Sequence, residues 1–466
     1  MRRIPRLNAP LLPLTVCLMA GIVVGQLLAP ALLAGLLLGA VLLALLLGRW
    51  PIAQSIALWG CFLLLGMLVA PGSEERMPDG VWTEAVVASV PAERPKTVMV
   101  ELLLPETGEQ RRCYVWKDGR SLQLTVGQEL EVCLRDSQFV GRDGWRIGGD
   151  GFNRLTHLQR LRIRALQWRG SLAAKFRTME GDEDAHAVLA AMALGDKSAL
   201  TRELRDTYSV SGASHVLALS GLHLSIVYLL LTQLTLRRWR YCLTQGVIVL
   251  CIWAFALLTG LSTSIVRAAT MLTVYSLFSL GGRRHAPLGT LSFTAMLMLL
   301  TDSRLLFDVG FQLSFMAMLG ILLFHPLFER MVSAKWMMTH RPVKWLYGLT
   351  SVSVSAQLGT APLIAYYFGR FSTWFLLTNF IVIPLTTLIL YGALLVLVIP
   401  AWGSILLWIV GMMNRALGWI SALPLASIDG LHPSVLQVAM LYVLIAIFYL
   451  LLALQSPRER VRVRDI

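Results

Sequence analysis

The chain has 466 residues, of which 56% are hydrophobic and 15% are charged, and its mean hydropathy is +0.65. Soluble domains carry about 25% charged residues, so this composition excludes a soluble globular protein and indicates a chain that crosses a membrane several times. The formal net charge of +14 has two explanations, a topological excess of Lys and Arg in cytoplasmic loops and a polyanionic partner.

Residues 1–70 hold three apolar runs, near 11–30, 31–48 and 52–70, and are expected to form N-terminal transmembrane helices. The basic start MRRIPRLNAP is typical of a signal peptide, but no convincing cleavage site follows it and two further apolar runs come directly after. We therefore expect an uncleaved first helix. Arg2, Arg3 and Arg6 put the N-terminus in the cytoplasm, and three crossings then put residue 71 outside.

Residues 75–153 are predicted to form a small extracytoplasmic β domain. Segments such as TVMVELLL and ELEVCLR are short and β-rich, and Pro, Gly, Asp and Asn separate them. Five or six strands of this size favour a barrel of the OB type, with a plain β-sandwich as the alternative. The domain contains Cys113 and Cys133, for which a disulfide and two free thiols are both open. No Cys/His spacing indicates a zinc site.

One stretch of this domain, RRCYVWKDGR, interleaves cations with aromatic rings. Cations for phosphates and ring faces for bases are what a platform for single-stranded nucleic acid needs. The candidate binding residues are Arg111, Arg112, Tyr114, Trp116, Lys117 and Arg120. Against this hypothesis, residues 84–154 hold ten basic and eleven acidic residues, so the domain as a whole has no basic footprint.

Residues 154–180 are predicted to form a basic amphipathic helix that lies in the membrane interface. The stretch 154–177 carries seven basic residues and no acidic one. Its expected apolar stripe consists of Leu158, Leu161, Ala165, Trp168, Leu172 and Phe176, flanked by Arg162 and Arg169, whose stems can snorkel. The helix is expected to contact anionic headgroups, and a second hypothesis adds nucleic acid, bound through Arg160 and Arg164.

Residues 185–455 are predicted to form the main transmembrane domain, and 456–466 a basic cytoplasmic tail. Helices are expected near 217–236, 243–260, 263–280, 286–301, 307–325, 346–367, 374–400, 403–422 and 434–454. This assignment gives about twelve crossings with both ends inside, and it places the later Arg/Lys clusters in the cytoplasm. Because 371–403 is long and holds Asn379 and Pro384, we expect a break or a re-entrant segment there.

The stretch SHVLALSGLHLSIVYLLL at 214–231 combines two histidines, three serines and a glycine with leucines. His215 and His223 are eight residues apart, which on a helix separates them by about 12 Å along the axis, so one metal ion cannot join them. Ser220 and His223 share a helix face and could act as nucleophile and base, although a Ser and His on one turn are a weak signal.

A third interpretation is a polar lining for a path across the membrane. Polar groups are costly in hydrocarbon and are usually there for a reason. The candidate lining residues are His215, Ser220, Gly221, His223, Arg267, Asp308, Gln312 and Asn379. Arg267 is the costliest of them, and Asp308 is its expected partner. The alternative is that the small residues are packing contacts and that the histidines bond neighbouring helices.

Four stretches, in this order, resemble the successive signatures of the ComEC-type competence domain: MALGDKSAL at 192–200, SHVLALSGLHLSIV at 214–227, SIVRAATM at 264–271 and DVGFQLSFMAMLGILLF at 308–324. With the N-terminal helices and the β domain, the resemblance covers essentially the whole chain. It implies a bacterial inner-membrane channel that carries one strand of transforming DNA into the cytoplasm, with an external OB fold that binds DNA.

The chain departs from many members of that family, which continue into a metallo-β-lactamase-like domain taken to be a nuclease. This chain ends at SPRERVRVRDI and holds no HxHxDH-like cluster. We therefore expect transport without catalysis, metal or cofactor, in a short form, a truncated chain or a protein that works with a separate nuclease. A DNA receptor and an ATP-driven motor are expected as further chains, because no GxxxxGK[ST] loop is present.

Two other functions stay open. One is a transporter or flippase for another polar substrate, such as a polysaccharide or a lipid-linked sugar, which would need aromatic and carboxylate-lined clefts rather than cations. The other is an intramembrane serine protease that uses Ser220 and His223.

The expected topology can be tested by labelling single cysteines, introduced in a cysteine-free background, from outside the cell. A probe at Asp118→Cys should react and one at Arg460→Cys should not, because the first lies in the β domain and the second in the basic tail. The reverse pattern would contradict both the topology and an external β domain.

Overall fold

The computed structural model describes residues 10–25, 30–71, 80–135, 138–234, 241–280, 287–332 and 341–455. The remaining residues include most of the basic clusters on which the topology rests. Arg2, Arg3, Arg6, Arg237, Arg238, Arg240, Arg283, Arg284, Lys335 and the tail 456–466 lie outside the described residues.

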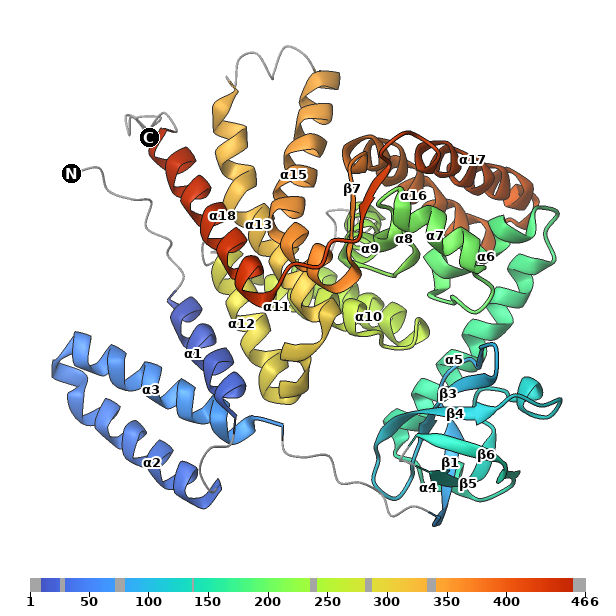
Figure 1. The fold of residues 1–466 in the computed structure, drawn as a ribbon, viewed down its shortest axis with the longest axis horizontal. Coiled ribbons are helices and arrows are strands. Elements are labelled where there is room, and N and C mark those ends of the chain that lie inside the picture. The colour runs from blue at the N-terminus through green and yellow to red at the C-terminus, as the bar shows by residue number, and fades with distance from the viewer. Residues whose placement is uncertain are drawn as a thin grey trace.

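The β domain is a closed barrel (Figure 1). Its strands are β1 (Trp82–Val87), β2 (Ala92–Glu93), β3 (Thr97–Leu103), β4 (Gln110–Trp116), β5 (Glu129–Arg135) and β6 (Phe139–Ile147). β1 pairs with both β3 and β5, which closes the sheet, and β4 and β6 form its parallel pair. Alternate residues such as Val98, Val100 and Leu102 fill the interior. The expected OB-like barrel is therefore confirmed in preference to a sandwich.

Both cysteines of the barrel are free thiols. Cys113 on β4 is completely buried in the core, whereas Cys133 lies on β5, and β6 separates these two strands. The disulfide that the sequence left open is therefore not formed. Burial raises the pKa of Cys113 to about 12, partly offset by the charge of Arg111, so its thiol stays protonated and unreactive at neutral pH.

A short helix, α4 (Gly151–Arg154), and a helix of 21 residues, α5 (His157–Arg177), lead from the barrel to the transmembrane body. Thr156 and Gln159 form a capping box at the start of α5. The single apolar stripe predicted for this helix is only partly right. Leu172 and Phe176 are buried, but Leu158, Leu161 and Trp168 are 78%, 50% and 63% exposed.

In the first half of α5 the buried face is instead formed by Ile163, Leu166 and Arg169. Ile163 packs into a cluster with barrel residues Val86 and Leu103, and Leu166 approaches Gly260 at the end of α10 (Tyr241–Leu258). The helix carries two apolar stripes, and contact with the barrel decides which one the protein covers.

Arg162 and Arg169 do not snorkel as expected. Arg169 is 8% exposed and donates to the carbonyl of Thr259 at 3.3 Å, and Arg162 donates to the carbonyl of Gly260 at 3.2 Å. These carbonyls follow α10, where the helix dipole favours a positive charge. Arg162 also donates to Gln110 of the barrel at 2.7 Å, so this one side chain joins barrel and transmembrane body.

The body contains every helix expected from hydropathy. The N-terminal helices are α1 (Leu11–Val24), α2 (Pro30–Leu46) and α3 (Pro51–Val69), which lie together on one side (Figure 1). The helices after α5 are α6 (Glu183–Leu194), α7 (Arg202–Val210), α8 (Ser214–Leu217), α9 (Gly221–Leu234), α10, α11 (Thr263–Leu280), α12 (Pro287–Thr301), α13 (Val309–Met331), α15 (Arg341–Phe368), α16 (Phe375–Val398), α17 (Gly403–Ser421) and α18 (Val435–Gln455). Strands β7 (Arg370–Ser372) and β8 (Ser427–Asp429) pair between α15 and α18.

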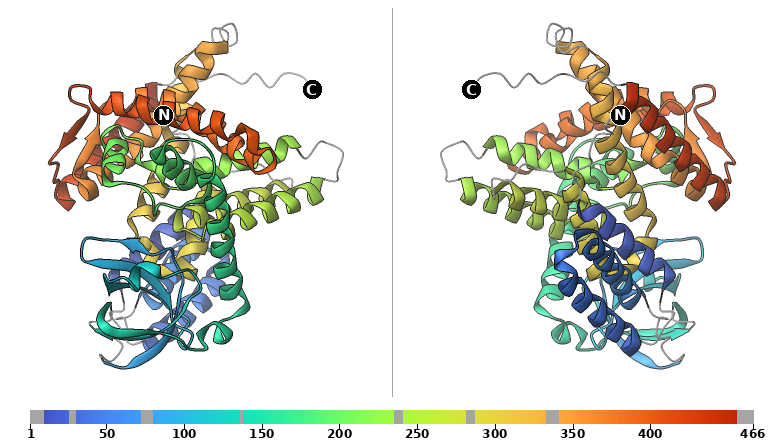
Figure 2. Two further views of the ribbon diagram at one scale, coloured as in Figure 1. Left: turned by 90° about the vertical axis from the view of Figure 1, so that its right-hand side faces the viewer. Right: turned by 90° about the vertical axis from the view of Figure 1, so that its left-hand side faces the viewer.

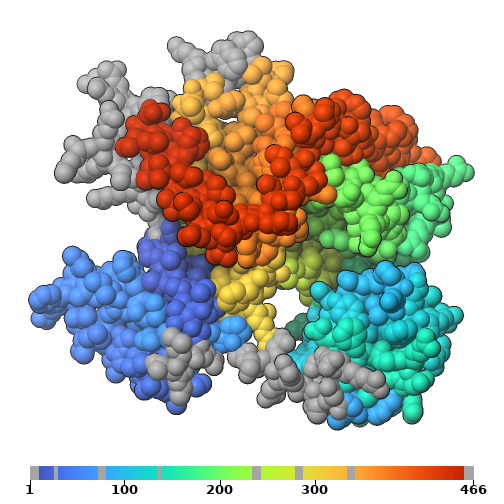
Figure 3. Space-filling view, viewed as in Figure 1, coloured from blue at the N-terminus to red at the C-terminus, as the bar shows by residue number. Residues whose placement is uncertain are grey.

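The described part of the chain holds six helices long and apolar enough to cross a membrane, and five shorter apolar helices. The protein is thus a multi-pass membrane protein with a barrel near its N-terminus. The two side views show the barrel at the same end of the molecule as α1–α3, with most of the later helices above them (Figure 2), and the space-filling view shows the barrel as a separate lobe (Figure 3).

Two helix predictions are wrong in detail. The helix expected at 217–236 is divided, because the chain leaves helical geometry at Ala218–Ser220 between α8 and α9. The break expected at Asn379 and Pro384 is absent, since α16 runs unbroken from Phe375 to Val398. A proline removes one backbone hydrogen bond, a loss that membrane helices tolerate when neighbours surround them.

Helices α13 and α15 pack through glycines. A Cβ atom at Gly359 would lie 2.1 Å from the carbonyl oxygen of Met316, and one at Gly320 would lie 2.3 Å from that of Ser355. Such contacts let two backbones approach closely, the usual mode of helix association in membranes. By contrast, a Cβ atom at Gly348, on the same helix α15, would meet nothing within 4 Å.

This packing predicts different effects for two glycine substitutions. Gly359→Val should destabilise the protein by about 1–3 kcal/mol, because the added side chain forces α13 and α15 apart. Gly348→Val should change stability little. Thermal unfolding of the purified chain in detergent measures both, and equal losses would contradict the proposed close contact.

Candidate functional site

The stretch from 214 to 223 forms a helical turn, a non-helical bend and the start of α9. His215 on α8 is exposed, and its Nδ1 lies 3.2 Å from the carbonyl oxygen of Gly212. His223 is completely buried. Its Nδ1 accepts the backbone N–H of Ser220 at 3.3 Å and lies 3.0 Å from the Ser220 hydroxyl. The imidazole thus binds back to the bend that precedes its own helix.

This geometry suits a structural histidine better than a catalytic one. A general base needs a free nitrogen beside the nucleophile and a group that orients the other nitrogen. Here the Nδ1 of His223 already accepts a backbone N–H, and its Nε2 has no partner within the described part of the chain. Over the same residues, no group of three or more His, Cys, Asp and Glu side chains could hold a metal ion.

Gly221 does not make the close helix contact that was one reason to expect a glycine there. It is exposed, and a Cβ atom would lie 3.7 Å from the Cβ of Ala268, an ordinary distance. A methyl group therefore fits at this position, and a larger side chain would extend into the space beside α11.

The predicted pair of Arg267 and Asp308 is confirmed. Arg267 on α11 is 2% exposed, and its Nη1 lies 3.5 Å from Oδ1 of Asp308. Its Nη2 donates to the hydroxyl of Ser264 at 3.1 Å, and its Nε is without a partner among the described residues. Asp308 also caps α13, where its Oδ1 accepts the N–H of Phe311 at 2.7 Å. One carboxylate thus joins the start of α13 to a buried cation on α11.

The other two candidate lining residues bond to neighbouring segments. Gln312 donates to the carbonyl of Leu306 at 3.0 Å and accepts the hydroxyl of Tyr367 at 2.7 Å. Asn379 donates to the hydroxyl of Ser353 at 3.1 Å. The backbone N–H of Gln312 also donates to the carbonyl of Asp308 at 3.1 Å, so Gln312 adjoins the Arg267–Asp308 pair, whereas Asn379 bonds to Ser353 on α15.

On the barrel, the cations of RRCYVWKDGR are not free. Each lies beside a carboxylate of the same domain. The pairs are Arg111 with Glu109 at 3.0 Å, Arg112 with Glu101 at 3.7 Å, Lys117 with Glu93, and Arg120 with Asp118 at 3.5 Å. The phosphate-binding capacity expected of this motif is reduced accordingly, since each charge is already compensated.

Barrel closure instead creates a set of arginines stacked on aromatic rings. Arg142 lies 4.9 Å from the ring centre of Trp116, and Arg146 lies 4.9 Å from that of Trp82. Arg94 lies 5.5 Å from the ring of Tyr114, which also contacts Phe139 at 5.5 Å. We call Trp82, Arg94, Tyr114, Trp116, Phe139, Arg142 and Arg146 the arginine–aromatic face.

Sequence reasoning found only Tyr114 and Trp116 of this face. Trp82, Trp116 and Phe139 are 44%, 40% and 51% exposed, so their rings are accessible. The missed residues come from β1, β6 and the loop after β2. Phe139 and Arg142 meet β4 because β6 pairs with it, Arg146 meets Trp82 of β1, and Arg94 reaches Tyr114 from the other side of β4. The cations and aromatic rings within FVGRDGWRI were the available signal in the sequence.

Of the two basic residues predicted on α5 to bind nucleic acid, one is bonded to the backbone and the other is exposed. The Nε of Arg160 donates to the carbonyl of Leu155 at 3.0 Å, which ties this side chain to the turn before the helix. Arg164 is exposed on the same helix.

Known proteins resemble the transmembrane part of this chain. A family model described as competence protein matches residues 192–455. The ComE operon protein 3 of Bacillus subtilis (strain 168) is 27% identical over 286 residues, which cover 59% of this chain and 35% of that protein. An uncharacterized protein of Aquifex aeolicus (strain VF5) is 34% identical over 200 residues, 43% of this chain and 45% of that protein. The matched part thus spans less than half of either relative, and no solved structure matches.

The pair of Arg267 and Asp308 yields a stability prediction. Asp308→Ala removes the cap of α13 and leaves a buried guanidinium without its counter-charge, a loss of about 3–5 kcal/mol for a buried pair. Asp308→Asn keeps an oxygen for the cap and should cost less. Thermal unfolding in detergent compares them, and wild-type stability of Asp308→Ala would contradict a role for the pair in joining α11 to α13.

Proposed function

The chain belongs to the competence protein family, and on this premise we propose that it is a bacterial inner-membrane channel that passes one strand of DNA into the cytoplasm during natural transformation. The observation that carries the proposal is the family match over 192–455, which includes the helices that hold the buried polar groups. We assign no catalytic residue and no cofactor to the chain.

The barrel is proposed to receive the strand on its outer side. The arginine–aromatic face complements the groups that single-stranded DNA presents. Bases stack on the exposed rings, and the guanidinium groups bind phosphates while the arginine side chains stay over the rings. Trp116 with Arg142 and Trp82 with Arg146 are the two pairs in which both side chains are exposed, each with the guanidinium 4.9 Å from the ring centre. Arg111, Arg112, Lys117 and Arg120 are assigned a lesser share, since carboxylates compensate them.

Helix α5 is proposed to hold the barrel over the entrance. It bonds to the barrel through Gln159, Arg162 and Gln167, and to the end of α10 through Arg162 and Arg169. Arg164 adds positive charge beside the barrel for phosphates or anionic headgroups. Arg160 does the same when it releases the carbonyl of Leu155.

The path itself is proposed to run past the bend at 218–220 and the start of α11. Exposed His215 and Gly221 lie there, Ser220 borders them, and Ala268 faces Gly221 one residue after Arg267. Asp308 keeps 39% of its side chain exposed, so the pair that neutralises Arg267 borders accessible space. Gln312, Asn379 and His223 support the neighbouring helices. About twelve crossings, an external barrel and cytoplasmic termini complete the proposed topology.

A channel of this kind needs partners. A DNA receptor would deliver the strand, a nuclease would degrade its complement, and an ATP-driven motor in the cytoplasm would pull it. We propose these as separate chains, together with membrane lipids around the helices.

Binding of a labelled single-stranded oligonucleotide to the purified chain tests the receiving role. Trp116→Ala and Arg142→Gln should each weaken binding about tenfold, the range expected for loss of one stacked base, and affinity should fall steeply as salt rises. Trp50→Ala, which removes a tryptophan that is 69% exposed at the turn between α2 and α3, is the matched control and should bind like wild type. Undiminished binding by both barrel variants would contradict the assignment.

The protease alternative rests on the 3.0 Å contact between Ser220 and His223, and transformation assays separate it from a path. Ser220→Ala removes a hydroxyl but little volume, so a path predicts a modest loss of DNA uptake and a nucleophile predicts a near-complete loss. Gly221→Leu should block uptake at normal protein level, because the new side chain extends beside α11. Full uptake by Gly221→Leu together with none by Ser220→Ala would favour catalysis.

A further inference from the structure

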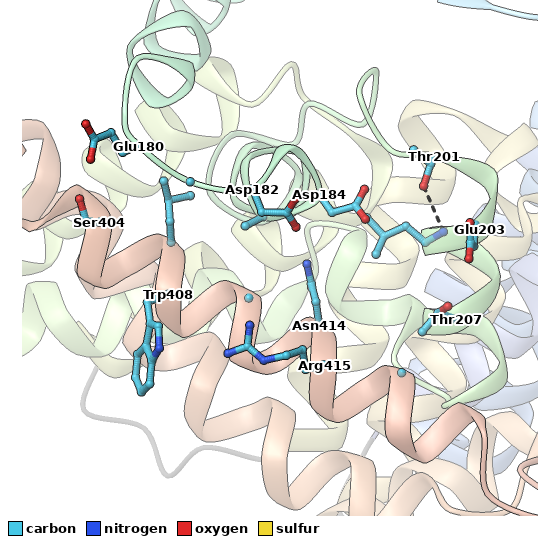
Figure 4. A pocket seen from close by; sticks show the side chains of 16 residues that line it. Glu180, Asp182, Asp184, Thr201, Glu203, Thr207, Ser404, Trp408, Asn414 and Arg415 are labelled. Carbon is cyan, nitrogen blue, oxygen red and sulfur yellow. Dashed lines mark hydrogen bonds between the residues drawn. The ribbon is translucent and has the colours of Figure 1, made fainter.

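A pocket separate from the proposed path lies between α17 and the segments around α6 and α7 (Figure 4). Its volume is about 490 Å³. One wall is formed by the α5–α6 junction and the start of α7, and the other by α17. Gly181 lets the junction approach this helix, since a Cβ atom there would lie 2.6 Å from a methyl carbon of Leu407.

The two walls carry opposite charges. Glu180, Asp182, Asp184 and Glu203 line the first, and Arg415 lines the second. Within the described part of the chain none of these five groups takes part in an ion pair, although ion pairs form elsewhere. Burial, followed by the charges of Asp182 and Glu203, raises the pKa of Asp184, so the acidic wall lacks a compensating cation.

An amide donor beside Arg415 is also unused. Asn414 accepts the hydroxyl of Tyr208 on its Oδ1 at 2.7 Å, which fixes the orientation of the amide. Its Nδ2 is buried and has no hydrogen-bond partner in the described part of the chain. Figure 4 shows Asn414 pointing from α17 toward Asp182 and Asp184, and Arg415 beside it with its side chain along α17 on the side of Trp408. A buried donor without an acceptor is costly, so this wall fits a ligand that brings an oxygen.

An exposed apolar surface adjoins the pocket on α17. Trp408 lines the pocket and is 61% exposed, and Ile405, one turn earlier on the same helix, is 51% exposed. Tryptophan is enriched where a membrane protein meets the lipid headgroups, because its ring is apolar and its N–H is polar. The groove therefore continues from a charged interior to a surface suited to acyl chains.

We propose that this pocket binds the headgroup of a zwitterionic aminophospholipid. The ammonium group faces the carboxylates of Asp182, Asp184 and Glu203, the phosphate accepts from Arg415 and the amide of Asn414, and the acyl chains lie along Ile405 and Trp408. A nucleic acid is excluded because four carboxylates repel its phosphates. A simple cation leaves Arg415 and Asn414 unsatisfied, and a simple anion leaves the acidic wall unsatisfied. The inference stands apart from the proposed DNA transport.

Lipid retention by the purified full chain tests the proposal. The chain is exposed in detergent to phosphatidylethanolamine, phosphatidylcholine or phosphatidylglycerol, and bound lipid is counted by native mass spectrometry. Phosphatidylethanolamine should be retained about tenfold more than the other two lipids. The ammonium of phosphatidylcholine cannot donate hydrogen bonds, and phosphatidylglycerol has no ammonium group. Equal retention of the three lipids would overturn the proposal, and so would equally tight binding of soluble phosphoethanolamine, which would mark a site for a free zwitterion.

Variants of each wall then test its role in lipid binding. Arg415→Gln and the double variant Asp184→Asn with Glu203→Gln should each abolish the preference for phosphatidylethanolamine. Arg330→Gln, which removes an exposed charge on α13 outside the pocket, should keep it. A preference that survives both pocket variants would overturn the proposal. The comparison of lipids on the unaltered chain decides the matter if a variant fails to fold.

Discussion

The contact of two arginines with the end of one helix determines how the two halves of this molecule fit together. Arg162 and Arg169 on α5 donate to the carbonyls of Gly260 and Thr259, which would otherwise lack partners after α10. Because α5 also bonds to two loops of the barrel and to Gln110 at the start of β4, the barrel is held at the turn between α10 and α11. Leu261 in this turn has a φ of 55°, a conformation that costs free energy. It is retained directly after the two carbonyls that Arg162 and Arg169 bind. Only a few residues further on, α11 carries Arg267.

The candidate polar residues within the helical body each have at least one local partner, although Nε2 of His223 and Nε of Arg267 have none in the described part of the chain. Arg267 has Asp308 and Ser264, Asn379 has Ser353, and His223 accepts a backbone N–H from the bend before its helix. Unpaired polar groups in a low-dielectric interior are expensive, so these bonds stabilise the helices whether or not a strand is present. A path for a polyanion must therefore use the groups that remain exposed, His215 and Gly221. The other polar residues can contact the strand only if they give up their present hydrogen bonds.

Much of the fold follows from the sequence, because hydropathy and alternation are local signals. The helices after 240 begin and end within a few residues of their expected bounds, except that α13 ends later and α15 begins earlier than expected. The barrel was recognisable from its short alternating segments. The pairing of Arg267 with Asp308 was predictable because a buried arginine requires a counter-charge. What failed depends on contacts between distant residues. Arg142 meets Trp116 only after β6 pairs with β4, and the buried face of α5 is chosen by the barrel. The charged pocket beside α17 joins residues more than 200 positions apart, so no local pattern could reveal it.

The central claim, passage of a single DNA strand, is tested most directly by electrical recording from the purified full chain in a planar bilayer. Applied voltage replaces the motor, because it drives the negatively charged strand across the membrane. The account predicts little conductance without DNA, and brief current events when single-stranded DNA is added on the barrel side, with none for a blunt duplex of equal length. Identical traces with and without single-stranded DNA, or equal responses to strand and duplex, would contradict it.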